Sequence, residues 1–412
     1  MGDPFKIGLL HYSCPPVIGG VEEVLRQQAG FLARAGHEVR VLAGEGGPFG
    51  EGLEVLIEPL AGSGHPEVRR AHEALRWRRP GGLRPLFARL CDLLCRWSEG
   101  LDLILAHNVL HMPYNLALTL AVRWLAGVSG GPAVISFAHD AAFFYQSPSE
   151  DPGRPPWPVL ARPHPRITYV TISEARRAMF SKLMPGTAFA VVSNGIDPAG
   201  YLGLSPETVR LIQDLDIYGR DLVLLQPVRL APHKNLELAL RITRALADLG
   251  RRVLWLAPAV VDRHAPTSAV YLIRLNDLIK MLDLAGRAVV LVQESGEAAR
   301  RLVRELYHLA DVLLMTSRDE GFGLTLLEAG LLKTPIACSD IPAFREVGRD
   351  LCWFSRHDPP EKTAVRIIEY LERTGTWSMY RRVLGRYNQA YVFQNELLPV
   401  LEQVRRRVNK KF

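Results

Sequence analysis

Long hydrophobic runs are absent from this chain of 412 residues. A membrane-spanning helix needs roughly 18 or more consecutive apolar residues, but polar residues interrupt even the most hydrophobic region, residues 101–127. The opening residues MGDPFKIGLLHYS also lack the basic start and continuous apolar core of a signal peptide. We therefore expect a cytoplasmic protein.

Cysteine is scarce as well. An odd number of scattered cysteines is typical of reduced thiols and not of a disulfide framework. Cys91 and Cys95 stand four residues apart, but no second pair has the spacing of metal ligands. We expect the cysteines to be small buried side chains and not ligands. They are Cys14, Cys91, Cys95, Cys338 and Cys352.

Neither sign of charge dominates strongly. The chain has 50 Lys and Arg against 43 Asp and Glu, a net charge of +7. This balance fits an anionic substrate, an acidic membrane surface or nucleic acid. No nucleic-acid-binding motif is present, so we predict no nucleic-acid partner. The apolar content of 48% is typical of a globular protein.

Short apolar runs alternate with helical patterns through most of the sequence, which predicts parallel α/β layers. Two clusters of runs predict two doubly wound domains, joined near residues 191–209, where Gly, Pro and Asn accumulate. Helices are expected at Val21–Ala35, Leu236–Leu249 and Arg300–Leu309. The expected strands are residues 6–10, 38–44, 101–107, 133–139, 167–173, 222–228, 252–258, 288–293, 311–317 and 335–340.

The segment SRDEGFGLTLLEAG follows one of these expected strands. In an open α/β sheet, ligands bind at the C-terminal ends of the strands. Gly321 and Gly323 let the backbone approach a ligand closely. From Leu324 the pattern becomes helical, and the free amides at a helix start favour phosphate. Glu320 and Glu328 can then accept hydrogen bonds from hydroxyls on either side of that phosphate.

The stretch EGFGLTLLE closely resembles the hallmark of retaining GT-B glycosyltransferases of the group-1 (family 4) class. The flanking segments LYHLADVLLMTSRD and KTPIACSDIPAFREV are similar to the family too, and the resemblance covers nearly the whole chain. It implies that Glu328 binds the nucleotide ribose and that Glu320 holds the transferred sugar. The further donor contacts that it implies in this turn are Gly321, Phe322, Gly323, Leu324 and Thr325.

Three other segments resemble the family. QPVRLAPHKNLELAL is similar to its basic donor motif, which implies that Arg229 and Lys234 contact the diphosphate. GGVEEVL resembles the opening glycine loop, which implies that Gly19 and Gly20 lie near the reacting phosphate or the acceptor. AVISFAHD matches the strand whose terminal histidine, here His139, lines the sugar pocket.

The resemblance implies a GT-B fold, with two Rossmann-like doubly wound parallel-sheet domains facing each other across a cleft. Residues 1–198 plus 390–412 are expected to form the N-terminal acceptor-side domain with a returning C-terminal helix, and residues 199–389 the donor domain. The implied reaction is metal-independent transfer of a glucose- or mannose-type hexose, with retention, from a UDP- or GDP-sugar to an acceptor hydroxyl. No cofactor is expected, because the nucleotide sugar is a substrate. The catalytic residues that we predict are His139, Arg229, Lys234 and Glu320.

The acceptor and the base are less well defined. Pro258 and residues 292–295 depart from the family pattern near the nucleotide, so UDP and GDP both stay open. The proline-rich residues 145–166 follow His139, and a long loop of this kind is often functional. We expect it to shape the acceptor site, with Asp140 and Tyr145 as acceptor contacts. A carbohydrate, a small molecule and a lipid-linked acceptor are all open.

Residues 69–97 are basic and amphipathic. A basic amphipathic helix can lie on anionic lipid, which would place the protein at the inner face of the membrane. We favour the alternative that the apolar stripe packs on its own domain, because most such stripes face a core. The stripe consists of Leu86, Phe87, Leu90, Leu93 and Leu94.

Every motif residue also has a structural explanation. The glutamates can be charges at a helix start, His139 a satisfied polar residue at a strand end, and Arg229 a salt-bridged strand residue. The segment HNVLH has the spacing of zinc-binding histidines but lacks the glutamate base, so we predict no metal there. A sugar phosphorylase, an epimerase or a non-catalytic nucleotide-sugar-binding protein on the same fold are the remaining functional alternatives.

Overall fold

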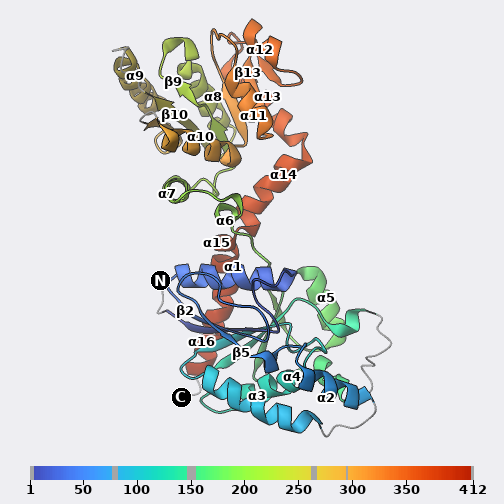
Figure 1. Cartoon of the computed structure of the whole chain (residues 1–412). Coiled ribbons are helices and arrows are strands. Elements are labelled where there is room, and N and C mark those ends of the chain that lie inside the picture. Colours follow the sequence, from blue (N-terminus) through green and yellow to red (C-terminus); the bar gives the residue numbers. More distant parts are fainter. Residues whose placement is uncertain (1–3, 77–81, 146–154, 261–266, 294–295, 410–412) are drawn as a thin grey trace. The chain divides into compact units, whose positions relative to one another are not determined.

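The computed structural model describes residues 4–76, 82–145, 155–260, 267–293 and 296–409. By its internal contacts the chain divides into two compact units. Unit 1 is Met1–Asp197 together with Tyr387–Phe412, and unit 2 is Pro198–Arg386 (Figure 1). Each unit contains a parallel sheet between layers of helices.

Unit 1 is built on a sheet whose strand order, within the described residues, is β3-β2-β1-β4-β5-β6-β7. Every ladder in it is parallel, and the central strands are almost wholly buried because both faces are covered. The strands are β1 (Lys6–His11), β2 (Glu38–Ala43), β3 (Glu54–Ile57), β4 (Leu103–His107), β5 (Ala133–Ala138), β6 (Ile167–Thr171) and β7 (Phe189–Val191).

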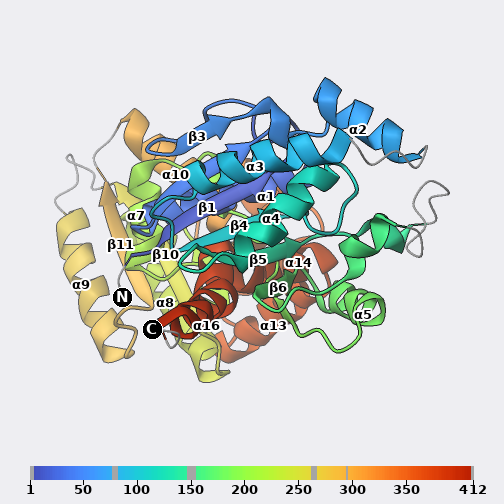
Figure 2. The ribbon, with the colours of Figure 1, turned by 90° about the horizontal axis from the view of Figure 1, so that it is seen from below.

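Helices cover both faces of this sheet. One core cluster packs the sheet against α2 to α5, and another packs it against α1, α15 and α16. Figure 2 shows α3 and α4 side by side along the sheet. The helices are α1 (Gly20–Arg34), α2 (Pro66–Arg76), α3 (Leu83–Trp97), α4 (Leu116–Gly127), α5 (Glu174–Leu183), α15 (Gln389–Val392) and α16 (Leu398–Asn409).

The last segment of the chain packs on unit 1. The backbone amide of Ile196 donates to the carbonyl of Tyr387 at 2.8 Å, and the amide of Gln389 donates to the carbonyl of Ile196 at 2.7 Å. Beyond this bridge, Val400 and Leu401 are buried in the same core as α1. The returning helix is therefore part of the hydrophobic core of unit 1.

The apolar stripe of residues 69–97 lies inside unit 1. Leu86, Leu90, Leu93 and Leu94 are buried in the core between α3 and the sheet, and Phe87 packs against them. The favoured alternative is therefore confirmed for the stripe, while Arg84, Arg89 and Arg96 of the same helix are exposed. Among the described residues, no helix combines the length and apolar character that crossing a bilayer requires.

One expectation for the cysteines is wrong. Cys14, Cys91, Cys338 and Cys352 are buried and free, but Cys95 is exposed. Cys95 lies on α3 next to Arg96, which is also exposed, whereas Leu94 and Trp97 on either side of these two residues are buried.

Unit 2 contains the second sheet, with the order β11-β10-β8-β12-β13-β14 and with β9 paired to β10. The expected strand at residues 222–228 is divided, because Pro227 has no amide hydrogen to donate to a ladder. The strands are β8 (Leu222–Leu225), β9 (Val228–Arg229), β10 (Val253–Val260), β11 (Ala288–Gln293), β12 (Val312–Met315), β13 (Ile336–Ser339) and β14 (Cys352–Phe354).

Two hydrophobic clusters form the core of unit 2. One packs α8, α9 and α13 on the sheet, and the other packs α7, α10, α11 and α12. The helices are α6 (Pro198–Leu202), α7 (Pro206–Asp214), α8 (Leu236–Asp248), α9 (Thr267–Met281), α10 (Glu297–Leu309), α11 (Leu324–Leu331), α12 (Pro342–Val347), α13 (Pro360–Glu372) and α14 (Gly375–Arg382).

A buried carboxylate connects the sheet of unit 2 to α14. Asp311, 1% exposed, accepts hydrogen bonds from the amide of Val223 at 2.6 Å and from Trp377 Nε1 at 2.8 Å. Arg381 lies 3.2 Å from the same carboxylate. Each of these partners is a donor, so the ionised carboxylate satisfies all of them.

Replacing Asp311 by alanine should destabilise unit 2 by about 3–5 kcal/mol, because it removes the negative charge beside the largely buried Arg381 guanidinium and the acceptor of the Val223 and Trp377 N–H groups. Urea unfolding measures the change. As a matched control, Asp248→Ala removes an exposed pair with Arg244 and should cost no more than about 0.5 kcal/mol. Equal losses in the two variants would contradict the role of Asp311.

Candidate functional site

A lysine–glutamate contact joins two motif segments at the C-terminal edge of the unit 2 sheet. Lys234 Nζ lies 2.6 Å from Glu320 Oε1, although the residues are 86 positions apart. Their side chains are only 15% and 13% exposed. Ser317 donates a second hydrogen bond to the same oxygen at 2.9 Å. Lys234 and Glu320, two of the predicted catalytic residues, are thus in direct contact.

The loops that carry this pair are held together by their backbones. The amide of Arg318 donates to the carbonyl of His233 at 2.7 Å, and Thr316 Oγ1 donates to the carbonyl of Asn235 at 2.8 Å. Thr316 itself is fully buried. Hydrogen bonds to main-chain carbonyls therefore hold the two loops together in addition to the ion pair between Lys234 and Glu320.

The glycine-rich turn ends at Gly323, which precedes α11. Gly323 has φ +96°, and a Cβ there would lie 3.0 Å from the ring of Phe344. Glycine is therefore required at this position by both backbone and packing. Gly321, in contrast, has open space on the side where a Cβ would lie. Phe322 and Leu324 are exposed, so the first amides of α11 are at the surface of unit 2.

Glu328 lies one turn into α11 and contacts a tyrosine that the sequence did not single out. Tyr307 Oη donates to Glu328 Oε2 at 3.0 Å. Tyr307 is buried, and burial together with the nearby carboxylate raises the pKa of its phenol far above the ordinary value. The hydroxyl therefore stays protonated and orients Glu328. Thr325 contributes its carbonyl as a second acceptor for Tyr307, at 3.4 Å.

Arg229 stands apart from these contacts. It lies on the short strand β9 and is exposed. Its backbone pairs with β10, but its side chain has no hydrogen-bond or ion-pair partner among the described residues, so the contact between Lys234 and Glu320 does not extend to it.

In unit 1, three histidines from neighbouring strand ends form a buried cluster. His11 ends β1, His107 ends β4, and His139 follows β5. His107 Nδ1 lies 3.0 Å from His139 Nε2, and His11 Nδ1 lies 2.8 Å from the carbonyl of His107. Burial lowers the pKa of His139 to about 3 and that of His107 well below its ordinary value, with a further contribution from the neighbouring imidazoles.

The segment after His139 is held by an asparagine. Asn108 Oδ1 accepts from the amides of His139 at 2.8 Å and Asp140 at 3.0 Å. Tyr145 Oη then donates to Asp140 Oδ2 at 2.6 Å, and Arg176 lies 3.1 Å from the hydroxyl and 3.4 Å from the carboxylate. The two predicted acceptor residues are therefore neighbours, with Arg176 as a partner that the sequence did not reveal. Residues 146–154 of the proline-rich loop lie outside the described residues.

The glycine pair precedes and opens α1. Gly19 is its N-cap, with extended backbone, and a Cβ there would collide with the carboxylate of Glu22. Ser13 Oγ donates to Glu22 Oε1 at 2.5 Å, and His11 Nε2 lies 3.8 Å from the same oxygen. Gly20 has open space around it. Glu22 thus connects the glycine loop to the histidine cluster.

His111, the second histidine of the segment HNVLH, forms hydrogen bonds within the core of unit 1. His111 Nε2 lies 3.1 Å from Ser136 Oγ and its Nδ1 lies 2.9 Å from the carbonyl of Leu160. Burial lowers the pKa of His111 to about 4. Across the described part of the chain, no group of three or more His, Cys, Asp or Glu side chains has the arrangement of metal ligands.

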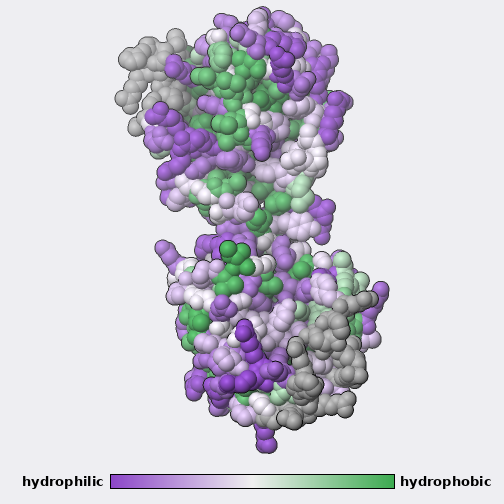
Figure 3. All heavy atoms as spheres, turned by 45° about the vertical axis from the view of Figure 1, so that its right-hand side comes forward, coloured by the Kyte–Doolittle hydropathy of each residue, from purple (hydrophilic) through white to green (hydrophobic). Residues whose placement is uncertain are grey.

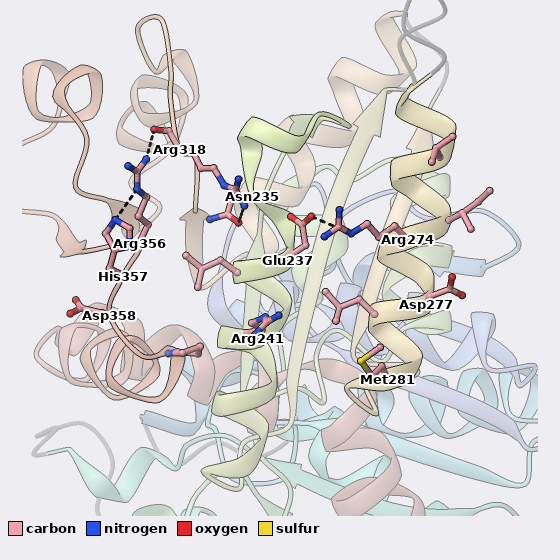
Figure 4. A pocket seen from close by; sticks show the side chains of 15 residues that line it. Asn235, Glu237, Arg241, Arg274, Asp277, Met281, Arg318, Arg356, His357 and Asp358 are labelled. Atoms are coloured by element: carbon pink, nitrogen blue, oxygen red, sulfur yellow. Dashed lines mark hydrogen bonds and ion pairs between the residues drawn. The ribbon is translucent and has the colours of Figure 1, made fainter.

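A separate groove of about 1040 Å³ lies in unit 2 between α8, α9 and the start of α13 (Figure 4). Its described lining mixes arginines and carboxylates with exposed apolar residues of α9, and it includes none of the predicted site residues. The groove carries both signs of charge, which does not select one class of ligand. On the face drawn in Figure 3, hydrophobic residues likewise form patches among hydrophilic ones.

Two family models match the chain. The one described as Glycosyltransferase Family 4 matches residues 18–199, and the one described as Glycosyl transferases group 1 matches residues 210–388. The first match covers most of unit 1 and the second most of unit 2.

Curated relatives resemble parts of the chain. The serotype-specific mannosyltransferase WbdA of Escherichia coli is 37% identical over 67 residues, 16% of this chain and 8% of that protein. A D-inositol 3-phosphate glycosyltransferase of Kineococcus radiotolerans is 31% identical over 127 residues, 30% of this chain and 28% of that protein. The O-antigen chain mannosyltransferase RfbU of Salmonella typhimurium is 26% identical over 159 residues, 38% of this chain and 40% of that protein. Each match therefore spans less than half of the relative.

Solved structures align along nearly the whole chain at low similarity. HepE of Anabaena, in complex with UDP and glucose, has 18% identity and a TM-score of 0.35, over 98% of this chain and 100% of that one. WaaG, a glycosyltransferase involved in lipopolysaccharide biosynthesis, has 17% identity and a TM-score of 0.34, over 94% and 96%. Because the two family models together match most of the chain, and each matched part is a parallel-sheet α/β unit of the GT-B type, the chain belongs to the group-1 glycosyltransferases.

Proposed function

We propose that this chain transfers a hexose of the glucose or mannose type from a UDP- or GDP-sugar to an acceptor hydroxyl, with retention of the anomeric configuration and without a metal ion. The observation that carries the proposal is the contact between Lys234 and Glu320 at the edge of the unit 2 sheet. The Lys234 ammonium group and the Glu320 carboxylate, which can accept hydrogen bonds from sugar hydroxyls, lie within 2.6 Å of each other. They lie beside the loop that leads into the start of α11. A sugar diphosphate needs both kinds of group.

In the proposed reaction, the acceptor oxygen bonds to the anomeric carbon as the bond from that carbon to the diphosphate oxygen breaks. The acceptor proton passes to the departing phosphate oxygen, so no protein nucleophile is required. Lys234, Arg229 and the first amides of α11 stabilise the departing diphosphate, since fixed donors aimed at developing charge are effective catalysts. Glu320 holds hydroxyls of the sugar, and Glu328, oriented by Tyr307, holds the ribose.

Unit 1 supplies the acceptor side in this proposal. Asp140 and Tyr145, with Arg176, form a partly exposed polar group suited to an acceptor hydroxyl. The similarity to the mannosyltransferases WbdA and RfbU favours mannose among the hexoses and a glycan among the acceptors, whereas the similarity to a D-inositol 3-phosphate glycosyltransferase favours a small acceptor. We place the reaction in the cytoplasm, with exposed arginines of α3 as the surface that would meet an anionic membrane if the acceptor is lipid-linked.

Two other functions are possible on the same residues. A sugar phosphorylase would use inorganic phosphate as the acceptor and release a sugar phosphate. A non-catalytic protein would bind the nucleotide sugar without turnover. The paired Lys234 and Glu320 support donor binding in all these cases, so only product analysis separates them.

A thermal-shift series with UDP-glucose, GDP-mannose, UDP and GDP should identify the donor. A ligand that binds only the folded protein stabilises it by about 2.7 kcal/mol when present at a hundred times its Kd. We expect one nucleotide sugar to raise the Tm and to be hydrolysed slowly to its nucleoside diphosphate without an acceptor. Release of a sugar phosphate, or binding without turnover under any acceptor, would exclude the transferase.

Variants of the ion pair test the role of unit 2. Lys234→Ala should lower kcat by more than about tenfold while the fold survives, because it removes a cation from the departing diphosphate. Glu320→Gln should also lower kcat, but it should bind the free nucleoside diphosphate several-fold more tightly, since it frees Lys234 from its partner. Isothermal titration and steady-state kinetics measure the two effects.

Lys362→Ala is the matched control for the ion-pair variants, because it removes an exposed lysine–aspartate pair of unit 2 with Asp358. Its turnover should equal that of the unaltered chain. Unchanged kcat in Lys234→Ala would remove the assigned role of that lysine.

A further inference from the structure

The contact between His107 and His139, at the C-terminal edge of the unit 1 sheet, limits which ring nitrogens of the two residues can carry a proton. His107 Nδ1 and His139 Nε2 are 3.0 Å apart, which is a hydrogen-bond distance between two ring nitrogens. In a neutral imidazole one nitrogen carries a proton and the other a lone pair. One of these two nitrogens must therefore donate and the other accept.

Both rings are neutral at ordinary pH. His107 is fully buried and His139 is 6% exposed. Burial, with the adjacent imidazoles, lowers the pKa of His107 well below the ordinary range and that of His139 to about 3. A charged ring in either place would have to be desolvated beside another imidazole that offers no negative charge.

The second nitrogen of His107 decides between the two arrangements. Among the polar atoms that the structure describes, His107 Nε2 is enclosed and has no hydrogen-bond partner. If His139 were the donor, His107 would carry its proton on Nε2 as a buried N–H without an acceptor. Buried N–H groups without partners are rarer in proteins than incompletely used acceptors, and each one is costly. The arrangement with the proton on His107 Nδ1 leaves only a lone pair enclosed.

Neighbouring groups hold the His107 ring in this orientation. Its ring stacks on Phe137, with centroids 4.9 Å apart and planes 22° from parallel. Its carbonyl accepts from His11 Nδ1 at 2.8 Å, and a carbonyl can only accept. His11 therefore fixes the main chain of His107, while Phe137 limits rotation of the side chain.

We infer that His107 is a positioning residue that donates from Nδ1 to His139 Nε2 and thereby keeps His139 in the tautomer with its own proton on Nδ1. His139 Nδ1 has no partner among the described residues and, unlike His107 Nε2, is not an enclosed atom. His139 thus presents an N–H donor to its ligand, and not the lone pair of a base. The tautomer stands by itself, while the chemical role, donation to a sugar oxygen, rests on the proposed transferase function.

The tautomer is measurable on the unaltered protein. Nitrogen-15 NMR of the chain labelled in its 12 histidines distinguishes the two neutral forms, because protonated and unprotonated ring nitrogens have well-separated shifts. The His139 signals are assigned by their loss in His139→Gln. At neutral pH we expect the Nδ1–H form for both His107 and His139. An Nε2–H form for His139 overturns the inference, whatever the protein's activity.

Two substitutions at His107 separate donation from packing. His107→Phe keeps an aromatic ring against Phe137 but removes the donor, so His139 should shift toward the Nε2–H form and kcat should fall about tenfold, as expected for the loss of one hydrogen bond. His107→Asn places an amide N–H near the position of Nδ1 and should recover the Nδ1–H signal of His139 and part of kcat. The KM for the donor should change less than kcat in both variants.

His111→Phe is the control for loss of a buried histidine. Its partners are Ser136 and the carbonyl of Leu160, and it makes no contact with His139. It should lower the Tm without changing the His139 tautomer. If His107→Phe leaves both the tautomer and kcat unchanged, His107 has no positioning role. If no donor is turned over at all, the proposed function fails, but the NMR result still decides the tautomer.

Discussion

The parallel direction of the strands is the constraint on which both candidate sites depend. When all strands of a sheet run the same way, the loops that follow them emerge at one edge. In unit 2 this brings Lys234 and Glu320 to within 2.6 Å across 86 residues of sequence. In unit 1 it brings together histidines from three adjacent strand ends. Neither group could form if one of the strands ran in the opposite direction.

The lysine–glutamate pair and the histidine cluster differ in how the free-energy cost of burying polar side chains is reduced. In unit 2, the partly buried lysine and glutamate lie 2.6 Å apart, so each is the counter-charge of the other. In unit 1 burial lowers the pKa of His107 and His139, so the two imidazoles are neutral and form a hydrogen bond with each other. A charged group suits a diphosphate, and a neutral donor suits a sugar oxygen.

The two glutamates of the motif have different environments, although their spacing suggests a single unit. Glu320 lies in a loop and shares one oxygen with a lysine and a serine. Glu328 is exposed on α11, where a buried tyrosine that cannot ionise near neutral pH holds one of its oxygens. Gly323 lies between the two glutamates at the start of α11. Its positive φ angle and the nearby ring of Phe344 both favour a residue without a side chain at this position. The packing of Phe344 against Gly323 thus contributes to the shape of the turn.

Many of the elements and all of the motif residues could be predicted from the amino-acid sequence. Alternating apolar runs predicted a strand at residues 6–10, which in the structure ends one residue later at His11, the division of the chain into two parallel-sheet parts, and a helix beginning at Leu324, because these patterns reflect local periodicity. The folded chain was needed to show which distant side chains meet: His107 with His139, Tyr307 with Glu328, and Arg176 with Asp140. It also showed the interruption at Pro227 and the burial of the stripe on α3. The reason is that strand order and register set these contacts. The periodicity of one segment does not indicate which other segment will lie beside it.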